Sequence, residues 1–320
     1  MIKLNEETLP QIEKELGINA PYVKGVKVKV KNCWHFTTDG NAVDVIFLNE
    51  NDFVAGMNRI FVVVSRFRIL ILAFCLMDTH VHFILYGEYG ECNRFMHEYV
   101  RLTSMAIAHD HGDRKKLADV PVHYQPITDD AYLKTAICYV LRNPPVGGLP
   151  FNAYDYPWSS AALYFRKMGL WTSPVLQMFA ENSLPQESRH QRIVLRTRNV
   201  GYENTGMFDT MVFPGEYVSY GLVEAIFKTC KSFFYFMSRT REDDVEQRGG
   251  VISMLSVPMQ EMRQNKNELC QRMFGVQSIR TLSTSQRLRL AKSLKAKYNS
   301  STKQIARLCG LVYDEVKGLL

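Results

Sequence analysis

Two histidines stand two positions apart inside an apolar stretch, and their type and spacing could hold a metal ion. His80 and His82 fall in the second of two apolar runs, 69–77 and 80–86, which are joined at Asp78 and Thr79. The runs predict two strands folded back on each other. Because side chains alternate between the faces of a strand, both imidazoles leave the same face. The sequence therefore predicts a chelating pair.

A structural interpretation of the pair stands beside this one. Single histidines on apolar strands are more often core residues with satisfied hydrogen bonds than metal ligands. Here the flanking residues Phe83, Ile84 and Leu85 offer the imidazoles no hydrogen bonds. A buried polar group without a partner is unfavourable, so two histidines on one face favour a metal or a charged partner.

A tyrosine and an asparagine one helical turn apart are the second candidates. Apolar residues at helical spacing predict a helix that is capped by Asp129 or Asp130 and stopped by the proline pair at 144–145. Tyr139 and Asn143 occupy positions i and i+4, so they lie one above the other at the margin of the buried stripe. The structural alternative is a half-buried tyrosine and an asparagine chosen because it precedes proline.

These candidates must be positioned by elements that the hydrophobic pattern predicts. The order of strand, helix, two strands, helix and strand is typical of an α+β, ferredoxin-like sandwich with an antiparallel sheet. The expected elements are a strand over 26–38, a helix over 51–66 capped by Asn51 or Asp52, the histidine hairpin, a helix over 92–110 and a short edge strand over 120–127.

Composition places the chain among globular proteins. It has 320 residues and 46% hydrophobic content, enough for a sizeable core and more than one domain. The beginning lacks the layout of a signal peptide, and Asp78 and the histidines interrupt the apolar run at 69–86, so we expect a cytoplasmic protein that does not contact a membrane. The seven cysteines never form Cys-x-x-Cys and are expected to be core residues, which argues against a disulfide framework or a zinc ribbon.

The net charge of +7 is concentrated near the end of the chain. Residues 259–320 carry 12 Lys and Arg against 4 Asp and Glu, a net +8, which leaves −1 for residues 1–258. From Arg280 to Arg307 there are eight basic residues and no acidic one. Such a composition is typical of segments that contact phosphates.

The last residues fit a helix-turn-helix. Residues 301–320 have a small Ala306 where two helices would cross and Gly310 in the turn, after a helix expected over 284–298. The core of this unit is expected to contain Ile305, Leu311, Val316 and Leu319.

Three other segments carry no recognisable chemistry. Residues 1–22 predict a short helical lead-in with Asn5 as a cap. Residues 217–238 predict one buried helix, and 239–250 a charged linker.

Four strings, in order, resemble those of a known family. His80-Val81-His82, preceded by Met77, looks like the HUH motif of single-tyrosine transposases, and Tyr139-Val-Leu-Arg-Asn143-Pro144 resembles the Tyr-x-x-x-Asn-Pro of their REP-associated branch. Tyr154-Asp-Tyr-Pro-Trp-Ser-Ser160 is similar to a string that follows in that branch, and Trp34-His35-Phe36-Thr37-Thr38 to its first-strand His-x-Thr segment. The resemblance covers residues 25–165.

The resemblance implies a ferredoxin-like HUH domain that cleaves and rejoins single-stranded DNA. Tyr139 would be the nucleophile and would form a 5′-phosphotyrosine intermediate, leaving a 3′-hydroxyl. His80 and His82, with Asn143 as third ligand, would hold one Mg²⁺ or Mn²⁺. No nucleotide cofactor is expected, because the covalent bond conserves the energy of the phosphodiester.

The expected partner is single-stranded or hairpin DNA, and a homodimer is one of two assemblies known in the family. Several basic residues are expected to contact DNA phosphates. They are Arg114, Lys115, Lys116, Arg287, Arg289, Lys292, Lys295, Lys297, Lys303 and Arg307.

The predicted domain organisation has four parts. They are a lead-in over 1–24, the catalytic domain over 25–165, a helical connecting region over 166–258 and the basic helix-turn-helix domain over 259–320. One alternative function is a non-catalytic, domesticated DNA-hairpin-binding protein or repressor with the same fold, which would bind hairpins without cleavage. Another is a metal-dependent hydrolase, which would release product without a covalent intermediate.

Overall fold

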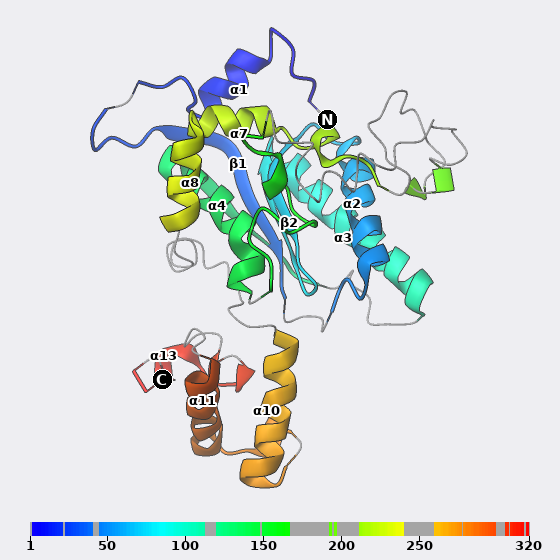
Figure 1. Cartoon of the computed structure of the whole chain (residues 1–320), viewed down its shortest axis with the longest axis vertical. Coiled ribbons are helices and arrows are strands. Elements are labelled where there is room, and N and C mark those ends of the chain that lie inside the picture. Colours follow the sequence, from blue (N-terminus) through cyan, green and yellow to red (C-terminus); the bar gives the residue numbers. More distant parts are fainter. Residues whose placement is uncertain are drawn as a thin grey trace. The chain divides into compact units, whose positions relative to one another are not determined.

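A computed structural model gives the fold of the chain (Figure 1). It forms two compact units, Met1–Arg142 with Asn152–Ile252, and Asn143–Phe151 with Ser253–Leu320. The residues described are 2–21, 23–40, 45–112, 120–147, 149–166, 192–193, 195–196, 211–239, 259–276, 278–298, 305–306, 308–316 and 318–319, with the backbone alone at 259–264, 280, 296–298 and 314.

A four-stranded antiparallel sheet forms the centre of the first unit. Its strand order is β2-β3-β1-β4, and each neighbouring pair is antiparallel. The α+β class, the histidine hairpin and the edge position of the last strand are thus confirmed. The strands are β1 Lys29–Thr38, β2 Leu70–Leu76, β3 Val81–Tyr86 and β4 Val122–Asp129.

Helices α2 and α3 cover one face of the sheet and α4 covers the other (Figure 1). On β3, the Phe83 ring lies 5.4 Å from the Phe95 ring of α3. The next residue back, His82, faces Tyr139 of α4 with ring centroids 5.8 Å apart. The alternation of side chains along β3 therefore separates an aromatic face from a histidine face. The bounds are α2 Glu50–Val64, α3 Tyr89–His111 and α4 Asp130–Val146.

A segment after α4 covers the outer edge of β2. The backbone N–H of Leu76 donates to the Trp158 carbonyl at 2.9 Å, and the N–H of Ser160 donates to the Phe74 carbonyl at 3.1 Å. The hydroxyl of Tyr156 donates to the Leu76 carbonyl at 2.7 Å. These residues belong to the string at 154–160 quoted above, so its local role is to satisfy the backbone groups of a strand edge. The 3-10 helix η2, Ala161–Leu163, follows.

The proline pair does not stop α4 where predicted. The helix continues through Pro144 and Pro145 to Val146. The backbone N–H of Gly147 bonds to the Asn143 carbonyl at 2.7 Å, which closes the last turn. Proline removes an N–H donor, and near the end of a helix this removes few bonds. The predicted start is confirmed, because the Asp129 side chain accepts from the N–H of Tyr132 at 2.8 Å.

Two other helices begin at residues that the sequence did not predict. Asn49 caps α2, where its side chain accepts from the N–H of Asp52. Helix α1, Leu9–Glu15, begins after Thr8 and not after Asn5. Asn5 Oδ1 instead accepts from the Thr8 N–H at 2.9 Å, so it orders the turn before the helix.

The single helix expected over 217–238 is two helices. Helix α7, Tyr220–Phe227, ends at Lys228, whose φ is +65°. Helix α8, Cys230–Arg239, follows at once, and Thr229 Oγ1 accepts from the Ser232 N–H at 3.1 Å. A left-handed residue followed by a capping threonine ends one helix and begins the next. The 3-10 helix η3, Pro214–Glu216, precedes them. The described part of the expected linker is its first residue, Arg239.

The second unit has a helical core of its own. The core contains buried Leu290 and Leu294 of α11 together with Ile305 and Cys309. Gly310 has a φ of +61°, which confirms its place in a turn. Val316 is buried, but Leu319 is 53% exposed, so its predicted core position is wrong. Its helical elements are α10 Met259–Phe274, η4 Ile279–Thr281, α11 Thr284–Tyr298 and α13 Tyr313–Val316.

The structure also tests the expected burial of the cysteines and the expected lack of a membrane-spanning segment. Six of the seven cysteines are buried, as expected of core residues, but Cys230 is exposed at the start of α8. Across the described residues, no helix has both the length and the apolar composition that crossing a membrane requires.

Candidate functional site on the histidine face

The two histidines of the hairpin lie together in the interior. His80 immediately precedes β3 and is 3% exposed, and His82 is within β3 and fully buried. Their ring centroids are 4.8 Å apart and the rings are nearly perpendicular, at 87°. The strand therefore brings both imidazoles to one place on the histidine face.

In each of the two histidines, Nδ1 makes a polar contact that orients the ring. Nδ1 of His80 lies 3.0 Å from Oγ1 of Thr79. Nδ1 of His82 lies 3.1 Å from Nε2 of His35. Histidines that bind metals commonly engage one ring nitrogen in an outer hydrogen bond and coordinate with the other. In both rings, Nε2 is accordingly the nitrogen that would coordinate a metal ion.

His35 is a member of the site that the sequence did not single out. It lies on β1, is fully buried, and stacks on His82 with centroids 5.3 Å apart. Burial lowers the pKa of His35 to about 4, so the ring is neutral near pH 7. Its Nε2 can therefore accept a hydrogen bond from Nδ1–H of His82. No local pattern in the sequence marks His35 as a site residue, because its place beside His82 depends on the pairing of β1 with β3.

Tyr139 packs against both of these rings. Its ring centroid lies 5.8 Å from that of His82 at 88°, and 5.7 Å from that of His35 at 71°. The side chain is 4% exposed, so it is more deeply buried than a residue at the margin of a helix stripe. Helix α4 thus directs Tyr139 toward the histidine face. Asn143, one turn further along α4, is also buried, at 5% exposure.

The donor atoms that the resemblance implies, two imidazole nitrogens and the Asn143 amide oxygen, would suit a divalent metal. Two imidazole nitrogens with an amide oxygen are acceptable to Mn²⁺, and Mg²⁺ accepts the oxygen more readily than the nitrogens. Within the part of the chain that the structure describes, no group of three or more His, Cys, Asp and Glu side chains could hold a metal ion. The proposed ligand set depends on an asparagine as its third member.

Two other tyrosines stand away from the histidine face. Tyr99 of α3 packs against Phe83 with centroids 5.3 Å apart, and its hydroxyl donates to the Gly56 carbonyl at 3.4 Å. Burial raises the pKa of Tyr99 above its ordinary value. Tyr124 of β4 is 46% exposed, with its ring 4.7 Å from that of Tyr89. Neither makes a described ring contact with the two hairpin histidines.

The predicted DNA-contacting residues of α11 divide into two groups. Arg287 is half-buried, and its guanidinium donates to the carbonyls of Leu282 at 3.0 Å and Gly310 at 3.3 Å. It therefore holds the turn at Gly310 in place. Arg289 and Lys292 are exposed and Lys295 is half-buried. The remaining predictions, Arg114, Lys115, Lys116, Lys303, Arg307 and the side chain of Lys297, lie outside the described residues.

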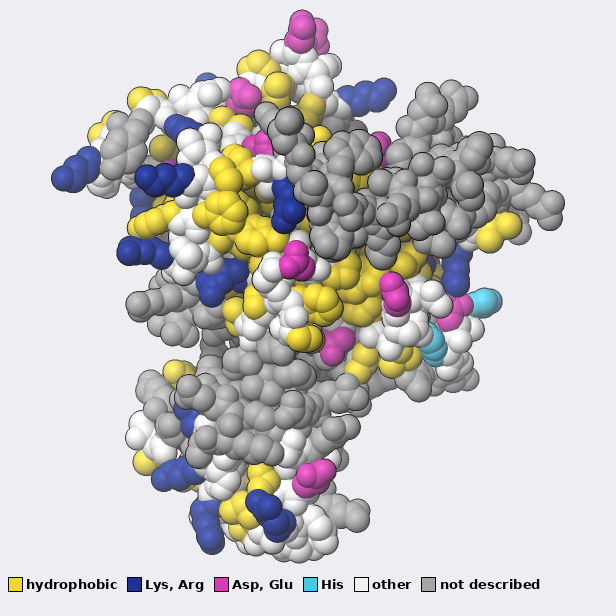
Figure 2. Space-filling model, viewed as in Figure 1, with side chains coloured by type: hydrophobic (Ala, Val, Ile, Leu, Met, Phe, Trp, Pro, Cys, Tyr) yellow, Lys and Arg dark blue, Asp and Glu magenta, His cyan; other side chains and the backbone are white. Residues whose placement is uncertain are grey.

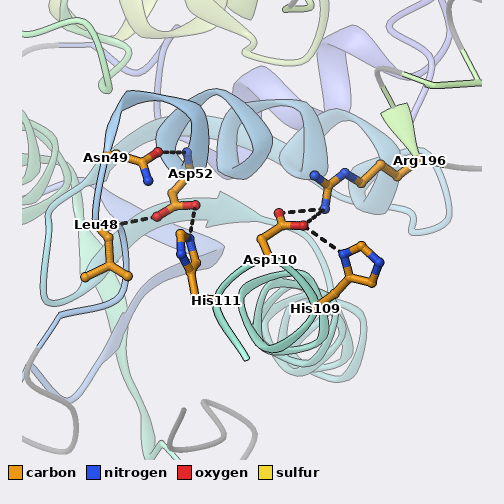
Figure 3. Close-up of polar contacts among 7 residues, drawn as sticks. All are labelled: Leu48, Asn49, Asp52, His109, Asp110, His111 and Arg196. Atoms are coloured by element: carbon orange, nitrogen blue, oxygen red, sulfur yellow. Dashed lines mark hydrogen bonds and ion pairs between the residues drawn. The ribbon is translucent and has the colours of Figure 1, made fainter. Parts of the chain in front are cut away.

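A separate set of polar contacts joins α2 to α3 (Figure 3). Asp52, near the start of α2, lies 2.7 Å from Nε2 of His111, at the end of α3. The neighbouring Asp110 lies 2.8 Å from Nδ1 of His109 and 2.8 Å from Nη1 of Arg196. These residues belong to the layer on the aromatic face and are not part of the histidine site.

Comparison with known proteins gives one weak likeness. No family model and no curated protein matches the chain. A solved structure described as a REP-associated tyrosine transposase bound to a REP hairpin is similar, with a TM-score of 0.33 and 15% identity. The match covers 46% of this chain and 86% of that one. At these values the likeness establishes neither the family nor the activity of this chain.

Proposed function

We propose that the protein is a metal-dependent, single-tyrosine DNA transposase of the HUH type, similar to the REP-associated branch. Its ferredoxin-like catalytic domain would span residues 25–165. The observation that carries the proposal is the packing of Tyr139 against His82, at a centroid distance of 5.8 Å. Because α4 and β3 are separate in sequence, the strings that carry the resemblance did not require this proximity.

Each residue of the site has a proposed role. Nε2 of His80 and Nε2 of His82, with the Asn143 amide oxygen, would hold one Mn²⁺ or Mg²⁺ ion. When bound, the ion supplies positive charge that polarises the scissile phosphate. His35 accepts a hydrogen bond from Nδ1 of His82, across 3.1 Å, and so fixes the ring orientation.

Tyr139 is the proposed nucleophile. Its phenolic oxygen forms a bond to the phosphorus while the bond to the 3′-oxygen breaks. The phenol loses a proton and the 3′-oxygen gains one. The product is a 5′-phosphotyrosine and a free 3′-hydroxyl, and attack by a 3′-hydroxyl on this link rejoins DNA.

The helical unit over 259–320 is proposed to bind DNA through phosphate contacts. Figure 2 shows Lys and Arg side chains, in dark blue, on the surface of this unit. Arg289 and Lys292 are exposed on α11, on the side away from buried Leu290 and Leu294. A neutralised phosphate releases counterions, so this binding would weaken as salt increases. The substrate is proposed to be single-stranded DNA that carries a hairpin.

The test is formation of a covalent protein–DNA adduct. The full chain is incubated with Mn²⁺ and a labelled single strand that carries a hairpin, and the products are separated under denaturing conditions. We expect an adduct, located on Tyr139 by mass spectrometry of the attached peptide. Tyr139→Phe should abolish it, because a phenyl ring has no oxygen nucleophile.

Tyr124→Phe is the matched control, since it also removes one phenolic oxygen but from an exposed site on β4. It should leave the adduct unchanged. An adduct that persists in Tyr139→Phe would exclude Tyr139 as the nucleophile. Hairpin binding without any adduct, unaffected by chelator, would favour a DNA-binding protein without catalysis.

A further inference from the structure

A pocket of about 500 Å³ opens between α2, α3 and residues 195–196. Its described lining contains three guanidinium groups and one imidazole, and no carboxylate. These basic residues are Arg59, Arg66, Arg196 and His109. The apolar part of the lining includes Val62 of α2 and Leu102 of α3. Basic groups that converge on a hollow favour an anion there.

Arg59 is the most buried of these basic residues. Its Nη1 donates to the Leu102 carbonyl at 2.6 Å, which fixes the half-buried guanidinium. Burial lowers the pKa of Arg59, and Arg196 lowers it further, whereas Tyr99 and Asp110 act in the opposite direction. Among the described side chains, no carboxylate lies within ion-pair distance of Arg59. A bound anion would offset the unfavourable desolvation of this cation.

The other two guanidiniums are partly exposed, and each is in an ion pair. Arg66 lies 2.9 Å from Glu98 and its side chain is 46% exposed. Arg196 lies 2.8 Å from Asp110 and its side chain is 47% exposed. Figure 3 shows Arg196 and His109 both directed at Asp110. Exposed ion pairs contribute little stability, so these guanidiniums can also bind a ligand that enters the pocket.

We propose that this pocket binds the phosphate group of a nucleotide. A phosphate presents several oxygens in a tetrahedral arrangement. The guanidiniums of Arg59 on α2, Arg66 just after α2, and Arg196 can approach these oxygens from different directions. The apolar part of the lining suits the sugar and base attached to the phosphate. The volume of the pocket lies in the range of small-ligand sites.

The phosphate site is distinct from the histidine site. The pocket is lined by α2 and α3, and α3 packs on the aromatic face through the contact of Phe95 with Phe83. The histidines project from the other face. The proposal therefore does not rest on the proposed cleavage reaction. The nucleotide can be free or can be part of a DNA strand, because both carry the same phosphate chemistry.

Isothermal titration of the full chain with thymidine 5′-monophosphate and with thymidine tests the site. We expect the monophosphate to bind and thymidine to bind at least about tenfold more weakly, because only the first makes charge-assisted hydrogen bonds. Arg59→Gln, Arg66→Gln and Arg196→Gln should each weaken monophosphate binding about tenfold. Thermal unfolding of each variant establishes that it is folded. If Arg59→Gln does not fold, the other two variants decide the result.

Arg101→Gln is the matched control. Arg101 lies on α3. Like Arg66, it bonds to Glu98, but it does not line the pocket. Its substitution should leave monophosphate binding unchanged. Equal binding of thymidine and its monophosphate, or equal effects of Arg196→Gln and Arg101→Gln, would overturn the proposal.

Competition with an oligothymidylate identifies the source of the phosphate. If the strand displaces the monophosphate and also binds more weakly to Arg196→Gln, the site holds a nucleotide of DNA. If strand binding is unaffected by Arg196→Gln, the site holds a free nucleotide. Monophosphate binding should persist in Tyr139→Phe, which separates failure of this proposal from failure of the proposed cleavage.

Discussion

The two faces of the sheet carry different side chains: aromatic and apolar residues on one, and histidines beside a tyrosine on the other. On β3, Phe83 faces an aromatic cluster with Phe95 and Tyr99 of α3. His82 faces His35 and Tyr139 instead. Both sets of side chains are almost fully buried. Burial on the aromatic face stabilises the fold, whereas burial on the histidine face places polar groups that an apolar core does not need. The difference agrees with the proposed function, in which the histidine face carries the chemistry and the aromatic face stabilises the fold.

Adjacent substitutions on β3 give the sharpest test of this division. His82→Ala should lower the rate of adduct formation by about 10³-fold or more, because it removes a proposed metal ligand. The measurement is the rate of covalent adduct formation with Mn²⁺ and a hairpin strand, scaled to the folded fraction. A rate close to that of the unaltered protein would break the assignment of chemistry to the histidine face.

Phe83→Ala should have its effect on stability. Removing a buried aromatic ring should lower the free energy of unfolding by about 3–5 kcal/mol, through lost transfer energy and a cavity. Denaturant titration measures this change. The rate of adduct formation per folded molecule should change little. If Phe83→Ala abolished the adduct in folded protein, the two faces could not be treated as separate.

His35→Ala tests whether a neighbouring ring positions His82. Loss of the hydrogen bond to Nδ1 of His82, now 3.1 Å long, should weaken Mn²⁺ binding by about 10–100-fold. His35→Gln keeps a hydrogen-bond acceptor and should recover part of the affinity. The readout is the Mn²⁺ concentration that gives half-maximal adduct. Equal effects of the alanine and glutamine variants would indicate packing alone.

The smallest effect is expected at the far end of β3, where α1 anchors the strand. Glu15 accepts from the Tyr86 hydroxyl at 2.7 Å and from Asn32 at 2.8 Å. Burial alone would raise the pKa of Glu15, but the hydrogen bonds from Gln11, Tyr86 and Asn32 outweigh it, so the pKa is lowered below 4.5. The unfolded chain then binds the proton more tightly than the folded protein. The stabilisation is present above pH 4.5 and is lost as the pH falls through the folded value.

Glu15→Gln should remove this pH dependence and lower the free energy of unfolding by about 1 kcal/mol at pH 7. Unfolding by urea at several pH values between 3 and 7 measures both. Adduct formation at pH 7 should not change. An unaltered acid dependence in Glu15→Gln would assign that dependence to other carboxyl groups.

Much of the first unit could be predicted from local patterns. The histidine hairpin, the helix of Tyr139 and the edge strand before it follow from apolar periodicity and turn residues that act within a few positions. Helix ends were less predictable. The cap at Asn49, the passage of α4 through Pro144 and the break at Lys228 depend on which backbone groups find partners in the folded chain.

The candidate site was likewise predictable only in part. By themselves, the residues of the sequence determined that His80 and His82 share one face, because alternation along a strand is a property of the backbone. They also determined that Tyr139 and Asn143 share one side of a helix. Only the tertiary structure decided that Tyr139 meets His82, that His35 completes the cluster, and that three arginines converge on a pocket in the other layer. Those contacts join residues far apart in sequence, and strand pairing and helix packing fix them over distances that no local pattern encodes.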